Sequence, residues 1–256
     1  MKMKYKNNKK YKIIFIIIFV LILIHFFFLN NNYEALWYVI KQFFKGNNNS
    51  GIPTSSYINK IILNQLEKIN NISEYTFIDF GCGDGHVLIN VHPLFNKVKG
   101  HVIGVDLDKD YIDTAIDNVN NHMNILYKEN ILKDKFLISS DKTNKKYKRE
   151  NISLHLEDII NTKYKNEDTI FYLYEPLWNV GTKEESRGIY SKVFNNLKNT
   201  FSTNGKNLYI VYISGISRKD IDVEYLKQYG FTTEIFNKQI GSLFLYRNIL
   251  IYKFHM

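Results

Sequence analysis

A cluster of glycines between two aspartates carries the strongest chemical signal in this sequence. Residues 79–85 read Asp-Phe-Gly-Cys-Gly-Asp-Gly and directly follow the apolar, β-prone residues 75–78. A strand that ends in a glycine-rich turn and opens a helix lets backbone groups approach a ligand closely. A second apolar run ends at Asp106, about twenty residues later, where a carboxylate can accept hydrogen bonds from both hydroxyls of a ribose. Together, the turn and the acid predict a nucleoside-binding site.

The spacing of the glycines separates two kinds of nucleoside ligand. Gly81, Gly83 and Gly85 are each separated by one residue and follow Asp79, whereas the dinucleotide fingerprint has a wider gap before its last glycine. An acid ahead of the turn suits a ligand with a charged amino group better than it suits a pyrophosphate. The pattern therefore disfavours an enzyme that depends on a nicotinamide cofactor.

Residues 79–85 resemble the first motif of the class I S-adenosylmethionine (SAM)-dependent methyltransferases, and Asp106 falls where that family holds the ribose. The resemblance implies an α/β fold with a doubly wound, seven-stranded, mostly parallel sheet. It also implies that SAM binds through residues in and around the turn, namely Asp79, Gly81, Gly83, Gly85 and Asp106. SAM carries an already activated methyl group, so alignment of the reactants supplies most of the rate advantage and we expect no metal site.

Two acids follow the third predicted strand, where the same family places an acceptor for the adenine amino group. A carboxylate recognises such an exocyclic N–H donor. The resemblance assigns this hydrogen bond to Asp158, with Glu157 as the alternative. A second interpretation of Asp158, as a solvated helix cap, stays open.

The fourth predicted strand leads into Glu-Pro-Leu-Trp at residues 175–178, at the end of the sheet where doubly wound folds bind ligands. Amine-methylating relatives have an Asn or Asp, two prolines and an aromatic residue here. Glu175 replaces the Asn or Asp, Leu177 replaces the second proline, and Trp178 stands at the aromatic position. We expect Glu175 to deprotonate or hold a cationic amine and Trp178 to pack on a methylammonium-like centre. The alternative is that Trp178 belongs to the core.

Composition bounds the class of protein. The chain has 256 residues, 45% of them hydrophobic, which suffices for one catalytic domain plus a tail. The net charge of +9 is concentrated in the first twelve residues, with six lysines, and in residues 128–149. Such local basicity favours a membrane surface or a solvated loop over a duplex-binding groove, so a nucleic-acid partner is disfavoured. Cys82 is the single cysteine, so no intramolecular disulfide can form.

Residues 13–29 predict a single-pass membrane anchor. They are apolar except for His25, and their 17 residues are at the short end of what spans a bilayer. No small-residue cleavage site follows, which favours a retained anchor over a removed signal peptide. The basic leader at residues 1–12 would stay in the cytoplasm and send the domain across, which conflicts with a cytosolic cosubstrate. Membrane and orientation therefore stay open.

The rest of the chain predicts a juxtamembrane segment and linker at residues 30–50 and a methyltransferase domain at residues 51–256. Apolar strand patterns alternate with helical patterns, as in a parallel sheet built from βαβ units. The predicted helices cover residues 57–69 and begin near Gly85, Lys109, Glu184 and Asp220. The basic insertion at residues 124–150 is expected to be an irregular loop, with a functional surface as the alternative. The predicted strands are 75–80, 101–106, 152–156, 169–174, 207–213, 232–236 and 247–253, the last two forming a hairpin with an antiparallel final strand.

The order of leader, anchor and glycine turn resembles membrane-bound lysine methyltransferases of the seven-strand class. This resemblance implies a protein lysine amine as the methyl acceptor, near or in the membrane that residues 13–29 enter. Residues 175–178 depart from those enzymes. A lipid or small-molecule acceptor, and a catalytically inactive, membrane-tethered SAM-binding module, are the alternatives.

Overall fold

The computed structural model of the protein describes residues 56–95, 100–128, 139–141, 146–149, 151–165, 167–174, 183–202, 205–215, 219–240 and 247–255. None of the helices in these ranges has the length and apolarity that a membrane crossing requires. The predicted anchor at residues 13–29 lies outside the described residues, as do the linker, Glu175 and Trp178.

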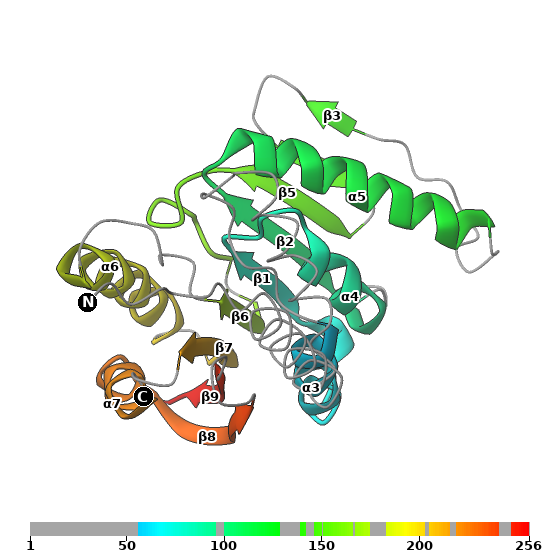
Figure 1. The fold of residues 1–256 in the computed structure, drawn as a ribbon. Helices are drawn as coiled ribbons and strands as arrows, with labels where there is room; N and C mark the ends of the chain where they lie inside the picture. Colours follow the sequence, from blue (N-terminus) through cyan, green and yellow to red (C-terminus); the bar gives the residue numbers. More distant parts are fainter. Residues whose placement is uncertain are drawn as a thin grey trace, which may run out of the picture.

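Nine strands of the described residues form one sheet, in the order β3-β4-β5-β2-β1-β6-β7-β9-β8 (Figure 1). The five strands from β5 to β7 run parallel, whereas β9 pairs antiparallel with both β7 and β8. The prediction of an α/β fold with seven mostly parallel strands and a terminal hairpin is confirmed for these elements. The seven matching strands are β1 (Thr76–Phe80), β2 (His101–Asp106), β5 (Ile152–Leu156), β6 (Thr169–Tyr174), β7 (Leu208–Gly215), β8 (Phe231–Ile240) and β9 (Arg247–Phe254).

Two further strands extend the sheet beyond β5. β3 (Ser139–Asp141) and β4 (Lys146–Arg149) form an antiparallel pair, and β4 pairs antiparallel with β5. The expectation of an irregular loop at residues 124–150 is wrong for these seven residues and for the end of α5. Without β4, the backbone N–H and C=O groups on that side of β5 would lack a strand partner, and pairing satisfies them. A lysine-rich sequence lacks the alternation of apolar and polar residues that would predict such strands.

Helices cover both faces of the sheet (Figure 1). Leu88 and Ala115 belong to a buried cluster on one face, and Phe194 and Leu226 belong to a second cluster on the other. The first face therefore carries α3, α4 and α5, and the second carries α6 and α7. Their bounds are α3 (Ser56–Leu66), α4 (His86–Phe95), α5 (Lys109–Lys128), α6 (Lys183–Phe201) and α7 (Lys219–Gln228).

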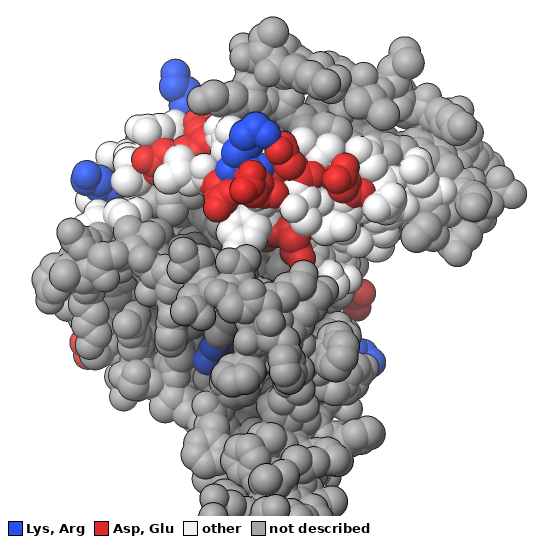
Figure 2. Space-filling view, turned by 45° about the horizontal axis from the view of Figure 1, so that its top comes forward, with Lys and Arg blue, Asp and Glu red and all other residues white. Residues whose placement is uncertain are grey.

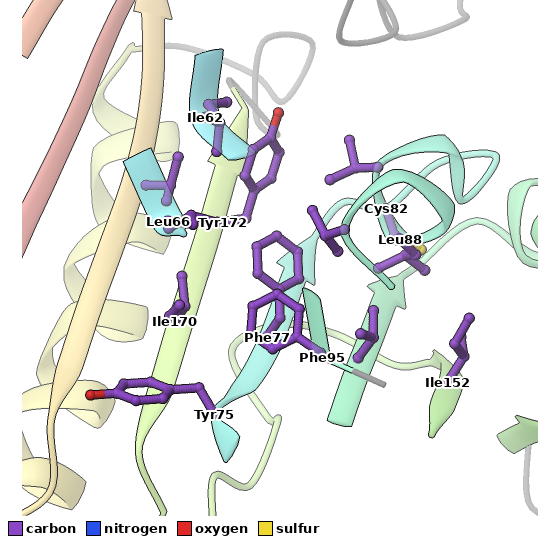
Figure 3. Close-up of a cluster of buried hydrophobic side chains, with 14 of the residues drawn as sticks. Ile62, Leu66, Tyr75, Phe77, Cys82, Leu88, Phe95, Ile152, Ile170 and Tyr172 are labelled. Carbon is purple, nitrogen blue, oxygen red and sulfur yellow. The ribbon is translucent and has the colours of Figure 1, made fainter. Parts of the chain in front are cut away.

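The first cluster fixes α3 and α4 against the centre of the sheet (Figure 3). Phe77 of β1 is fully buried, and its ring centroid lies 5.5 Å from that of Phe95 and 5.8 Å from that of Tyr172. Ile62 and Leu66 of α3 point into the same cluster. Burying each such side chain contributes roughly 1.5–3 kcal/mol. Because α4 begins directly after the glycine turn, this packing also fixes where the turn leads.

Candidate functional site

The glycine turn connects β1 to α4 at the carboxyl end of the parallel strands. Gly81, Gly83 and Gly85 have φ angles of 77°, 52° and 76°, in the left-handed region that other residues rarely adopt. A Cβ atom added to Gly85 would lie 3.1 Å from the Cβ of Ala115 in α5. The alternating glycines of the sequence are therefore required by backbone conformation and, at Gly85, by the close approach of a helix.

The end of β2 binds the first half of the turn. The N–H groups of Gly81 and Cys82 both donate to the carbonyl of Val105, at 2.8 and 3.1 Å. The N–H of Gly83 donates to Oδ2 of Asp106 at 2.9 Å. The turn and the predicted ribose acceptor are thus parts of one hydrogen-bonded unit.

The N–H groups in the second half of the turn also donate to acceptors within the protein. The N–H of Gly85 donates to the carbonyl of Cys82 at 2.9 Å, and the N–H of His86 donates to Oδ1 of Asp84 at 3.1 Å. Five of the six N–H groups from residue 81 to residue 86 therefore donate to protein acceptors. A phosphate-binding turn keeps such donors free for its ligand. This turn is not built to cradle a pyrophosphate.

Asp106 is oriented by two backbone donors. In addition to the bond from Gly83, its Oδ1 accepts the N–H of Asp108 at 2.9 Å. Each carboxylate oxygen has a second acceptor site, so the side chain can still receive two ligand hydroxyls. Burial raises the pKa of Asp106, and the N–H groups of Asp108 and Gly83 oppose that rise. The position and orientation suit the predicted ribose contact.

Asp79 lies under the turn and is 2% exposed. Burial raises its pKa well above the usual aspartate range, and the negative charges of Asp106 and Asp84 raise it further. Figure 2 shows that acidic side chains gather in one area of the face turned toward the viewer. Because the charges of Asp84 and Asp106 disfavour ionisation of Asp79, a cation bound beside these three carboxyl groups would be stabilised.

Asp158 lies in the loop after β5, and a backbone bond places this loop beside Asp106. The N–H of Glu157 donates to the carbonyl of Asp106 at 3.0 Å. Oδ1 of Asp158 accepts the N–H of Ile160 at 3.0 Å, so the side chain caps a local turn. No helix begins at Asp158 in the described residues, so the helix-cap interpretation is wrong, although the side chain does cap a turn. The remaining acceptor sites of this carboxylate leave the adenine contact as a prediction.

The predicted catalytic residues Glu175 and Trp178 lie outside the described residues. β6 ends at Tyr174, and its Leu173 pairs with Phe80 of β1. The carboxyl end of β6 is thus at the same end of the sheet as the glycine turn. Across the described ranges, no group of three His, Cys, Asp or Glu side chains is arranged to hold a metal ion.

Sequence reasoning missed two contacts that shape the turn. The side-chain amide of Asn118 in α5 donates to the carbonyl of Asp84 at 2.9 Å. A Cβ atom at Gly104 of β2 would lie 2.5 Å from Cδ1 of Leu88 and 2.9 Å from Sγ of Cys82, so only glycine allows this packing. Asn118 lies one helical turn after Ala115, but the sequence does not say which face of α5 meets the glycine turn.

A separate hollow of about 620 Å³ lies at the amino end of the parallel strands. Tyr75, Asp168 and Asn207, which directly precede β1, β6 and β7, line it together with Tyr209 and Lys253. It is therefore at the opposite end of the sheet from the glycine turn and takes no part in the site described above.

Comparison with known proteins supports the fold through structure alone. No protein-family model matches the sequence, and no curated protein matches it. Magnesium protoporphyrin IX methyltransferase from Synechocystis, solved with bound SAM, is 15% identical, with 77% of this chain and 78% of that chain covered and a TM-score of 0.50. A proposed RNA methyltransferase from Pyrococcus horikoshii is 14% identical, with 79% and 86% covered and a TM-score of 0.51. The chain has the fold of the class I SAM-dependent methyltransferases.

Proposed function

We propose that this protein is a SAM-dependent methyltransferase. The observation that carries the proposal is the inward use of the N–H groups in the glycine turn, combined with the buried carboxylate of Asp79 beneath it. A turn in which five of six N–H groups already donate within the protein, with acids around it, suits the positively charged sulfonium and amino groups of SAM. It does not suit the pyrophosphate of a dinucleotide. The solved structures of similar fold support the same cosubstrate.

The residues of the chain bind and align the cosubstrate. Asp106 holds the ribose hydroxyls with its two unused acceptor sites, and Asp158 accepts the adenine amino group. Asp79 and Asp84 favour the positive charges at the methionine end. SAM supplies a methyl group that is already activated on sulfur, so the protein needs only to orient the acceptor for methyl transfer.

We further infer that the acceptor is an amine, and that Glu175 and Trp178 receive it. Glu175 follows β6 at the carboxyl end of the sheet, where a carboxylate can hold or deprotonate an ammonium group. The face of Trp178 suits a methylammonium-like centre.

The apolar residues 13–29 and the six lysines before them support a location at a membrane. We propose that they anchor the enzyme as a single-pass protein next to a membrane-associated protein whose lysine is methylated. A lipid or small amphiphile at the same surface is the second candidate, because the anchor would bring either acceptor close. A catalytically inactive, membrane-tethered SAM-binding module is the third, because residues 175–178 depart from the pattern of amine-methylating relatives.

One labelling experiment separates these acceptors. The full-length protein and a chain lacking residues 1–45 are incubated with methyl-labelled SAM and with membrane or soluble fractions. The proposal predicts label in methyl-lysine of membrane proteins, and less of it with the truncated chain, while both proteins bind SAM equally. Label in lipid would favour the second candidate. Equal labelling of soluble RNA by both proteins would contradict the membrane acceptor.

The role of Glu175 separates an enzyme from an inactive binding module. The Glu175→Gln variant keeps the size of the side chain but cannot act as a base. We expect it to bind SAM as the unchanged protein does and to transfer label more slowly, by about 10²-fold or more. If neither protein transfers label while both bind SAM, the chain is a binding module.

A further inference from the structure

Helix α5 touches the glycine turn at two points. Cβ of Ala115 would lie 3.1 Å from a Cβ at Gly85, so the helix packs directly against this glycine. One turn further along the helix, Nδ2 of Asn118 donates to the carbonyl of Asp84 at 2.9 Å. Asn118 is half-buried and lies 34 residues from Asp84 in sequence. This bond is therefore a tertiary contact that fixes one peptide of the turn.

The beginning of α5 is tied to the same site. Asp106 accepts the N–H of Asp108, and Oδ1 of Asp108 accepts the N–H of Asp110 at 2.8 Å. The first turn of the helix is thus joined to the carboxylate that binds Gly83. The glycine turn is held at Gly83 by Asp106 and at Asp84 by Asn118, and both contacts come from one continuous segment of chain.

We propose that Asn118 is a positioning residue for the cosubstrate. Glycines at residues 83 and 85 leave the backbone around Asp84 free to adopt several conformations. The amide of Asn118 selects the conformation in which the carbonyl of Asp84 points at α5 and the N–H of Gly85 stays bonded to Cys82. When only a fraction of molecules has the binding conformation, the apparent dissociation constant rises by the inverse of that fraction. The inference rests on the proposed function only in naming SAM as the ligand.

Asn118→Ala and Asn121→Ala form a matched pair on the same helix. Asn121 is exposed, whereas Asn118 is half-buried against the turn. Alanine has the higher helix propensity, so both variants gain intrinsic helix stability and both are expected to fold. We expect Asn118→Ala to raise the Kd for SAM about tenfold, as if about a tenth of the molecules kept the binding conformation. Maximal turnover at saturating SAM should not change, and Asn121→Ala should alter neither quantity.

Amide hydrogen exchange measures how well the glycine turn is ordered in the absence of any ligand. Loss of the Asn118 bond should speed exchange at Gly85, whose N–H donates to Cys82, and leave Phe77 of β1 protected. A purely structural role would instead lower protection at both residues together. Asn118→Ser, with a shorter donor, provides the same comparison if Asn118→Ala fails to fold.

Three outcomes would overturn the inference. They are an unchanged Kd in Asn118→Ala, unchanged exchange at Gly85, and an increase in Kd that only follows a loss of global stability. Should the unchanged protein itself not bind SAM, the proposed function fails. The exchange experiment still decides whether Asn118 orders the turn.

Discussion

Two aspartates at opposite ends of the parallel sheet, Asp168 and Asp79, have opposite surroundings. At the amino end, Oδ1 of Asp168 accepts the backbone N–H of Asn207 at 2.7 Å and its side-chain amide at 3.2 Å. At the carboxyl end, Asp79 is buried near Asp84 and Asp106, and its pKa is raised. Asp168 is stabilised by donors within the protein, whereas Asp79 lies near two further negative charges that a bound cation would offset. The first arrangement serves stability and the second serves binding.

A second hydrogen-bond network at the amino end also pairs its polar side chains within the protein. The side-chain amide of Asn151 donates to the carbonyls of Phe95 and Gly100 at 2.8 and 3.3 Å, and its Oδ1 lies 2.8 Å from Nε2 of His92. These bonds join the end of α4 to the segments that open β2 and β5. Changes at the amino end should therefore alter stability alone, and changes at the carboxyl end should alter ligand binding.

The largest effect is expected from Gly83→Val. Gly83 has a φ of 52° and open space where a Cβ would point, so a valine side chain would enter the proposed SAM site. We expect the affinity for SAM to fall by about a hundredfold or more, equivalent to roughly 3 kcal/mol. Gly205→Val is a matched control, because Gly205 precedes β7 at the amino end with a φ of 65° and equally open surroundings. Calorimetry should show SAM binding lost in the first variant and kept in the second.

Asp106→Ala should have the next largest effect. It removes the predicted ribose acceptor and also the bonds from Gly83 and Asp108 that order the turn. Each hydrogen bond to a charged acceptor contributes roughly 1.5–3 kcal/mol, so the Kd for SAM should rise by well over about tenfold. Asp113→Ala, which removes an exposed ion pair with Lys109, is the control and should change little. Normal SAM binding by Asp106→Ala would refute the site.

Acid should destabilise the amino end through His92. Burial lowers the pKa of His92 from 6.5 to about 4. The unfolded chain therefore takes up a proton at a higher pH than the folded protein does. Stability from neutral His92 is complete above pH 6.5 and is lost as the pH falls toward 4, by roughly 3 kcal/mol. Urea unfolding gives the free energy of unfolding of the protein and of His92→Gln at pH 7, 5 and 4. The contribution of His92 is the extra stability that the unchanged protein loses between pH 7 and pH 4. An equal fall in the free energy of unfolding with pH in both proteins would contradict it.

Asp168→Ala should have the smallest effect, and on stability alone. It leaves two donors of Asn207 without their acceptor, at a cost of about 1–3 kcal/mol. Thermal unfolding should register this loss, while the Kd for SAM stays that of the unchanged protein. A weaker affinity for SAM would mean that the two ends of the sheet are coupled.

Sequence pattern predicts the fold well where apolar residues alternate with turns. Thr169–Tyr174 and His101–Asp106 match the predicted strands at both ends, because a buried parallel strand is an apolar run with sharp boundaries. Lys146–Arg149 escaped prediction because pairing with β5, instead of burial of an apolar face, makes it a strand.

The same limit applies to the site. Gly81, Gly83 and Gly85 could be placed in a tight turn because their backbone requirement is local, and their contact with SAM, like that of Asp106, stays a prediction. Asn118 could not be placed at the turn, since its partner depends on how α5 is rotated against the turn. Asp158 shows an intermediate case, in which local turn geometry satisfies one oxygen and the ligand contact depends on the neighbouring strand.

Calorimetric titration of the full-length protein with SAM over a range of pH values tests the central claim most directly. Because the pKa of Asp79 is raised by burial and by Asp106 and Asp84, affinity for the cationic ligand should increase as rising pH ionises this carboxyl. Asp79→Asn should remove that increase, and NAD should not bind. Saturable binding of NAD, with no binding of SAM or of S-adenosylhomocysteine at any pH, would contradict the account.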